Sequence, residues 1–198
     1  IGYLIANSSN PTVGVLALPG QVDVRIAAKA ANRDEAMKLI APLEAEVRGL
    51  LGNAIFAADD ETMEHVVGKL LRAQRNSVAV FEDLTCGQLA ERLQSASPEE
   101  FAGGFISNSP SATRALLSHG RDPERSDSLM QDPVALTDEL AWSVRKQTGC
   151  DLGLALHAIA DPASNIQNLA GGPTYISVTD GRRFMQRTST MAGRGAYD

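Results

Sequence analysis

The sequence is poor in cysteine and lacks long apolar segments. Its two cysteines, Cys86 and Cys150, form no spacing motif in a chain of 198 residues, so a disulfide framework is not indicated. A reducing cytoplasm is therefore the expected compartment. No apolar run approaches the roughly 20 residues that cross a bilayer, and no signal-peptide pattern occurs at the start. We expect no membrane association.

Basic residues are also in deficit. Lys and Arg total 18 against 24 Asp and Glu, which gives a net charge of −6. Neither half of the chain has the basic stripe that binding to a phosphate backbone requires, so nucleic acid is not an expected partner. Apolar residues make up 43% and charged residues 21%, as in a globular protein of one large or two small domains.

Residues 1–75 predict a small α+β domain. The start is rich in Asn, Ser and Pro and is typical of a linker or of the tail of a preceding domain. Because the chain begins at Ile1 rather than Met, we expect it to be part of a longer protein. Apolar periodicity then predicts strands at 12–18, 22–29 and 54–57 and helices at 34–51 and 59–74. The order is β-β-α-β-α.

Residues 76–198 predict a larger, three-layer α/β/α domain. The same patterns indicate strands at 77–81, 104–108, 152–159, 173–179 and 183–189, and helices at 85–95, 110–118 and 133–148. Strands that alternate with helices and end in a hairpin indicate a mixed sheet covered by helices. No helix follows the last strand, so we expect the C-terminus to be truncated.

The stretch "VFEDLTCGQLAERL" (80–93) places Glu82 and Asp83 between an apolar strand and a helix. The tetrad from Thr85 to Gln88 fits a capping box, in which both side chains satisfy N–H groups at the helix start. The alternative is that the N–H groups near Gly87 form a cradle for an anion or phosphate. Both interpretations can hold together.

Asp83 and His157 are the candidate acid–base residues. Adjacent carboxylates in a cleft raise one pKa, but strand alternation separates Glu82 from Asp83 unless the strand has already ended. Asp83 could instead favour the dipole of the following helix. His157 could pair with Asp83, form a weak metal site together with Asp161, or line a polar pocket. Because His-x-x-x-Asp is a common spacing, we expect no metal, and no cofactor is indicated.

Several motifs resemble the CinA (competence/damage-inducible) family. The segments "PGQVDVRI" and "IFAADDETMEHVV" resemble its middle, KH-like linker domain, and the chain from Ser77 onward resembles its C-terminal domain. The family patterns A-E-S-x-T-G-G, G-G-x-x-x-Y-S-N-x-x-K and A-V-T-G-I-A-G-P correspond here to "FEDLTCG", "GGFISNSPSAT" and "ALHAIADP". "GGPTYISV" is similar to the family strand G-T-V-Y-I-A.

The resemblance implies a domain that, in active members, hydrolyses the carboxamide of nicotinamide mononucleotide with a Ser nucleophile and nearby Tyr and Lys. The three positions are Asp83, Asn108 and Thr113 here. Asp83 has no hydroxyl, Asn108 cannot exchange protons as a phenol does, and Thr113 is no base at neutral pH. Cys86 replaces a glycine, which favours close packing over a reactive thiol.

The resemblance also implies a homodimer and a molybdopterin-binding-like domain before Ile1. Its motif positions supply the expected ligand-binding residues, namely Glu82, Thr85, Gly87, Gly103, Gly104, Asn108 and Thr113. The leading hypothesis is a CinA-like fragment whose amidohydrolase domain is catalytically degenerate but keeps a pocket for a small nucleotide-like ligand. One alternative is an active amidohydrolase in which Asp83 activates water and His157 assists. Another is a non-enzymatic ligand-binding or dimerisation module.

Overall fold

The computed structural model describes residues 1–18, 20–117, 127–159 and 172–191, which belong to two compact units, Ile1–Asp60 and Glu61–Asp198. This division differs from the predicted boundary after residue 75, because α3 (Met63–Gln74) packs within the second unit. A Cβ added at Gly68 of α3 would lie 2.9 Å from Ser97 Cβ, so the two backbones approach closely there. No described helix is both long and apolar enough to cross a membrane.

The first unit is a β-hairpin packed against helices. The predicted hairpin is confirmed, with β1 (Thr12–Leu18) antiparallel to β2 (Gln21–Ala27). Its core joins Val13 of β1 to Val47 of α2 (Arg33–Leu51) and to Leu4 of α1 (Gly2–Asn7). The linker expected at the start is therefore wrong for residues 2–7, because burial of Leu4 stabilises a short helix there.

The strand expected at 54–57 does not form. Helix α2 ends at Leu51, and its C-cap Gly52 has φ of 50°. A 3-10 turn (Gly52–Ala54) follows, in which Ile55 N donates to Gly52 O at 3.2 Å. No described strand pairs with residues 55–57, the part of the expected strand that follows this turn. The two-stranded sheet of this unit consequently contains only the hairpin.

The second unit contains the predicted mixed sheet, which is confirmed. Its five strands lie in the order β4-β3-β5-β6-β7, with β3 parallel to both neighbours and the last two pairings antiparallel. The strands are β3 (Val78–Glu82), β4 (Phe101–Ile106), β5 (Leu152–Ala158), β6 (Gly172–Thr179) and β7 (Phe184–Met191). The carboxyl ends of the three parallel strands share one edge of the sheet, where ligands bind in open α/β folds.

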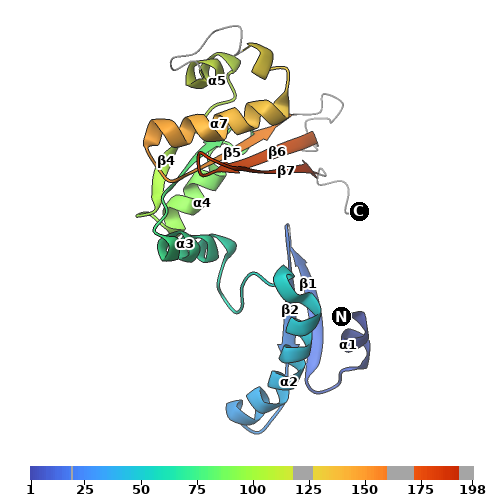
Figure 1. Cartoon of the computed structure of the whole chain (residues 1–198). Coiled ribbons are helices and arrows are strands. Elements are labelled where there is room, and N and C mark those ends of the chain that lie inside the picture. Colours follow the sequence, from blue (N-terminus) through green and yellow to red (C-terminus); the bar gives the residue numbers. More distant parts are fainter. Residues whose placement is uncertain (19, 118–126, 160–171, 192–198) are drawn as a thin grey trace. The chain divides into compact units, whose positions relative to one another are not determined.

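Helices cover both faces of this sheet, as the three-layer prediction requires (Figure 1). Alternation along β3 sends Ala79 and Phe81 towards α5 (Pro110–Leu117) and α7 (Pro133–Thr148). Val78 and Val80 face α3 and α4 (Gln88–Ala96). Because β3 is buried on both faces, its sequence "VAVFE" is almost continuously apolar.

Candidate functional site

The structure brings Asp83 and His157 together at the carboxyl edge of the parallel strands. Asp83 follows β3 and His157 lies near the end of β5, its parallel neighbour. The distance between Asp83 Oδ2 and His157 Nδ1 is 2.6 Å, and the two side chains are 10% and 21% exposed. The two residues that the sequence paired as acid and base thus meet in a largely buried contact.

Every oxygen of the Asp83 carboxylate accepts a hydrogen bond. Leu84 N donates to Oδ1 at 2.5 Å, and Ala158 N donates to Oδ1 and Oδ2 at 3.1 and 3.2 Å. An ionised carboxylate accepts only, so its contact with His157 Nδ1 places a proton on that nitrogen. A neutral His157 then has Nε2 as an acceptor, which is the arrangement of an imidazole that takes protons.

Glu82 is not a ligand-facing residue in this structure. Its side chain is 0% exposed, and its carboxylate accepts from Leu89 N at 3.0 Å and from Ala90 N at 2.7 Å. Thr85 Oγ1 also donates to it, at 2.6 Å. The expected capping box is therefore wrong. Glu82, from the preceding strand, satisfies the first turn of α4, whereas the helix N-cap is Gly87 and makes no side-chain bond.

The remaining N–H groups at the start of α4 are also occupied. Gln88 N donates to Thr85 O at 3.1 Å and Glu91 N to Gly87 O at 2.9 Å. The N–H groups of residues 88–91, which follow Gly87, are thus committed within the chain. A carboxylate already takes the place where an anion would interact with the helix dipole.

Cys86 is exposed, so the close packing expected for it is wrong. Its φ is 54°, and that of the following Gly87 is 93°. Both values lie in the left-handed region that glycine adopts without a steric cost. The backbone of this turn thus suits glycine at both positions, although the first of them is a cysteine.

The remaining expected ligand-binding residues are spread around β4 and α5. Gly104 packs so closely on β3 that an added Cβ would lie 2.9 Å from Val80 O, whereas Gly103 has φ of 121°. Asn108 is exposed in the loop after β4. Thr113 is 7% exposed and lies on the buried side of α5. None of the described contacts joins Asn108 or Thr113 to Asp83.

The structure places Tyr175, which belongs to the segment "GGPTYISV" and is not among the expected site residues, beside His157. The two residues are direct partners across β5 and β6, with ring centroids 6.3 Å apart and ring planes at 26°. On its other side Tyr175 pairs with Thr188 of β7. One row across the sheet therefore runs from His157 through Tyr175 to Thr188, which only the strand register could reveal.

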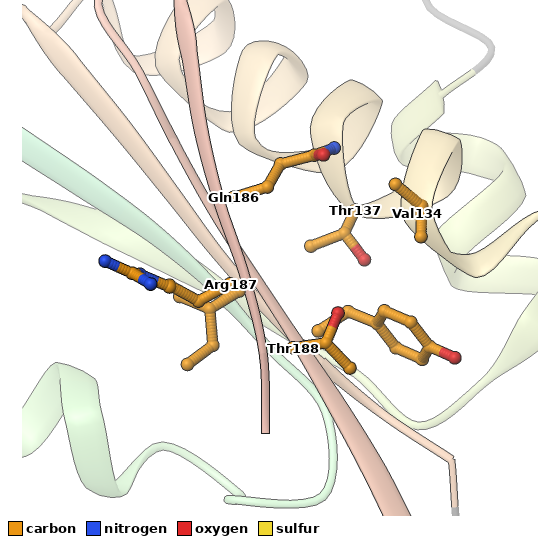
Figure 2. Close-up of a pocket in the computed structure, with 7 residues that line it drawn as sticks. Val134, Thr137, Gln186, Arg187 and Thr188 are labelled. Carbon is orange, nitrogen blue, oxygen red and sulfur yellow. The ribbon is translucent and has the colours of Figure 1, made fainter. Parts of the chain in front are cut away.

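A groove adjoins this row, between the start of α7 and strands β6 and β7. We call it the α7–β7 groove; it has about 280 Å³ of space, part of it open to solvent, and its lining residues are Val134, Thr137, Tyr175, Ile176, Gln186, Arg187 and Thr188. Figure 2 shows Gln186 on the same side as Thr137, whereas the Arg187 side chain points to the other side of β7. The side chains that enter the groove are thus uncharged.

A metal centre is not supported by the described part of the chain. Within it, no three His, Cys, Asp or Glu side chains are grouped so that they could hold an ion. Asp161, the third member of the metal site considered from the sequence, lies outside the described residues.

Comparisons with known proteins cover both units. Residues 1–57 match the model of the damage-inducible protein CinA KH domain, and residues 60–196 match that of the CinA C-terminal domain. A putative competence-damage inducible protein of Moorella thermoacetica is 34% identical over 88% of this chain and 42% of its own length. A CinA-like protein of Acaryochloris marina is 33% identical over 94% of the chain and 45% of its own length. The chain therefore spans less than half of these relatives.

Solved structures agree at the level of the fold. A competence-damaged protein (CinA) superfamily protein from Escherichia coli superposes with a TM-score of 0.57 at 17% identity, covering 72% of this chain and 86% of its own. A competence or damage-inducible protein from Enterobacter asburiae gives a TM-score of 0.55 at 20% identity, covering 67% and 86%. Because the model of the CinA C-terminal domain matches most of this chain, the chain belongs to the CinA family.

Proposed function

We propose that the C-terminal domain of this chain does not carry out the serine-based amide hydrolysis that the resemblance implies for active members, and that it retains a small-ligand site. The observation that carries the proposal is the engagement of Asp83, at the position of the serine. Its carboxylate accepts from His157, Leu84 and Ala158. A carboxylate with both oxygens held in this way is neither a free nucleophile nor a free base.

The other two substituted positions support the same proposal. Thr113, at the position of the lysine, is buried on the inner side of α5, and a hydroxyl there does not deprotonate a nucleophile. Asn108, at the position of the tyrosine, is exposed in a loop. One of these two substituted positions is therefore buried and the other exposed, and neither side chain has the chemistry that the resemblance implies there.

Ammonia release from nicotinamide mononucleotide tests this proposal. The expected result is no enzyme-dependent release above that of a heat-inactivated sample. Turnover that Asp83→Ala abolishes would overturn it. Asp83→Asn is the matched variant, because it keeps the shape of the side chain and removes its charge. Turnover that is lost in a folded Asp83→Asn protein would reflect the chemistry of the carboxylate and not a folding defect.

A second candidate is a hydrolase of altered mechanism, and the 2.6 Å contact between Asp83 and His157 favours it. Asp83 would orient the imidazole, and His157 Nε2 would take a proton from water that attacks a bound amide or ester. In this candidate Asp83 is a positioning residue and His157 the base. Release of ammonia or alcohol from a panel of small amides and esters, lost in His157→Gln, would establish it.

The family resemblance also supports a homodimer in the cytoplasm, together with a molybdopterin-binding-like domain in the complete protein. Exposed apolar side chains on the edge strand β7, Phe184 at 45% and Met185 at 76%, are compatible with an association of copies. Light scattering on the purified chain tests the dimer, because a monomeric mass across micromolar concentrations would contradict it.

A further inference from the structure

Strand β1 has an open edge in the first unit. The sheet of this unit contains only β1 and β2, so each strand has one side without a neighbouring strand. Val13 N donates to Ser8 Oγ at 3.0 Å rather than to β2, which identifies the outer side of β1. Because N–H groups alternate in direction along a strand, those of Val15 and Ala17 point to the same side. Within the described part of the chain, neither group has a hydrogen-bond partner on that side.

The open part of β1 is apolar on both faces. Val15 is 52% exposed on one face, and Leu16 and Leu18 are each 39% exposed on the other. β1 contains no charged residue and no proline, the features by which edge strands usually prevent association. β2, in contrast, carries Asp23 and Arg25. An uncharged, apolar edge on a sheet of only two strands favours pairing with a further strand.

The sequence of β1 is complementary to itself in an antiparallel pairing. A two-fold axis at Leu16 places Val15 opposite the partner's Ala17 and Gly14 opposite the partner's Leu18. Each larger side chain then meets a smaller one, which suits close packing across the two strands. No like charges meet, because the strand has none.

This register uses the part of the edge that is open. The outward N–H and C=O groups of Val15 and Ala17 can form hydrogen bonds with the same groups of the partner. Val13 keeps its hydrogen bond to Ser8, whereas an axis at Val15 would require Val13 N as a donor to the partner. The contact to Ser8 therefore favours the axis at Leu16.

We propose that two copies of this chain pair through β1, antiparallel about a two-fold axis at Leu16, to form a four-stranded sheet. The proposal rests on the homodimer proposed above and assigns its interface. Val22, which is 60% exposed, then lies in one apolar row with Ala17 and the partner's Val15. Strand β7 also lies at a sheet edge, but it carries Arg187, and a charge on an edge strand hinders pairing.

A cysteine pair tests the interface directly. Leu16 directs its N–H towards β2, so Leu16 and its copy form a non-hydrogen-bonded pair with Cα atoms about 4.5 Å apart, within the range of a disulfide. Leu16→Cys, in a Cys86→Ser background that removes the exposed thiol, should form a covalent dimer under mild oxidation. Val22→Cys in the same background is the matched control, because β2 and its copy would lie about 14 Å apart in the four-stranded sheet. We expect at least about tenfold more cross-linked dimer from Leu16→Cys.

Two proline variants measure the interface without cross-linking. Ala17→Pro removes an outward N–H from β1 and should weaken the dimer at least about tenfold in sedimentation equilibrium. Val22→Pro is the matched control, since Val22 pairs with Ala17 and its N–H points to the outer side of β2. Its dimer should stay within about twofold of the parent.

The outcomes separate the dimer from its interface. A parent chain that is monomeric across micromolar concentrations contradicts the proposed homodimer and overturns this interface with it. A dimeric parent in which Leu16→Cys and Val22→Cys cross-link equally overturns the interface alone. Equal weakening by Ala17→Pro and Val22→Pro, or no weakening by Ala17→Pro, also overturns the interface while the homodimer stands.

Discussion

Asp83 Oδ2 and His157 Nδ1 are 2.6 Å apart although 74 residues separate them in sequence. The contact joins the ends of two adjacent parallel strands, and Ala158 N strengthens it by donating to the same carboxylate. Because both side chains are largely buried, the pair is screened less by water than a surface ion pair. It should therefore couple β3 and β5 energetically.

A double-mutant cycle measures this coupling. Asp83→Asn and His157→Ala are each expected to lower the free energy of unfolding by about 1–3 kcal/mol, because each leaves a buried polar partner poorly satisfied. The double variant should lose less than the sum, with a coupling energy of about 1 kcal/mol in urea denaturation. The control cycle is Glu44 and Arg48, an exposed pair on α2 whose coupling should stay below about 0.5 kcal/mol. Additivity within about 0.3 kcal/mol at Asp83 and His157 would contradict the coupling.

Glu82 should be critical for the stability of the second unit. Glu82→Ala removes the acceptor for Thr85 Oγ1, Leu89 N and Ala90 N, and the expected loss is about 2–4 kcal/mol in the free energy of unfolding. Glu91→Ala is the matched control, because Glu91 is an exposed carboxylate in the first turn of the same helix. Its effect should stay within about 0.5 kcal/mol. Similar losses in the two variants would show that Glu82 does not cap α4.

The layers of the second unit were predictable because each element has a strong local pattern. The apolar run of β3, the Asp-Pro start of α7 and the hairpin turn at residues 179–183 each indicate one conformation. Asp132 indeed accepts from Val134 N and Ala135 N, as an N-cap does. The short strand at 54–57 was mispredicted, because four apolar residues form a strand only where an edge is available to pair.

The site was less predictable, because its contacts depend on the way strands align. The pairing of Asp83 with His157 followed from motif positions, and it remained one of several alternatives in the sequence. Glu82 lies in the strand before the turn, yet its side chain caps α4. Capping rules consider residues at the helix start itself, so they do not identify Glu82. Tyr175 became visible as a neighbour of His157 only through the register of β5 and β6.

Replacement of Cys86 by glycine should stabilise the turn. Cys86 has φ of 54°, where a side chain costs roughly 1 kcal/mol relative to glycine. Greater freedom of glycine in the unfolded chain offsets part of this gain, so we expect Cys86→Gly to raise the free energy of unfolding by about 0.5 kcal/mol. Cys86→Ala keeps a Cβ and is the control that should show no gain. A stability of Cys86→Gly below that of Cys86→Ala would contradict strain at this position.

Asp151 should make stability depend on pH through its contact with Ser77. Ser77 N donates to Asp151 Oδ2 at 2.8 Å and Ser77 Oγ at 2.7 Å, which joins the starts of β3 and β5. The backbone hydrogen bond first, and the hydroxyl second, lower the pKa of Asp151 from its ordinary value. The folded chain therefore holds the ionised form more strongly than the unfolded chain does.

The sign follows from this lowered pKa. The stabilisation is complete above the unfolded pKa, near 4, and is lost as the pH falls through the lower folded pKa. Urea midpoints of the parent should therefore exceed those of Asp151→Asn at pH 7, and the difference should shrink steadily below about pH 4. Asp60→Asn, at an exposed turn position, serves as the control for removal of one carboxylate. If the difference between the parent and Asp151→Asn instead grew on acidification, Asp151 would not be held ionised by Ser77 in the folded chain.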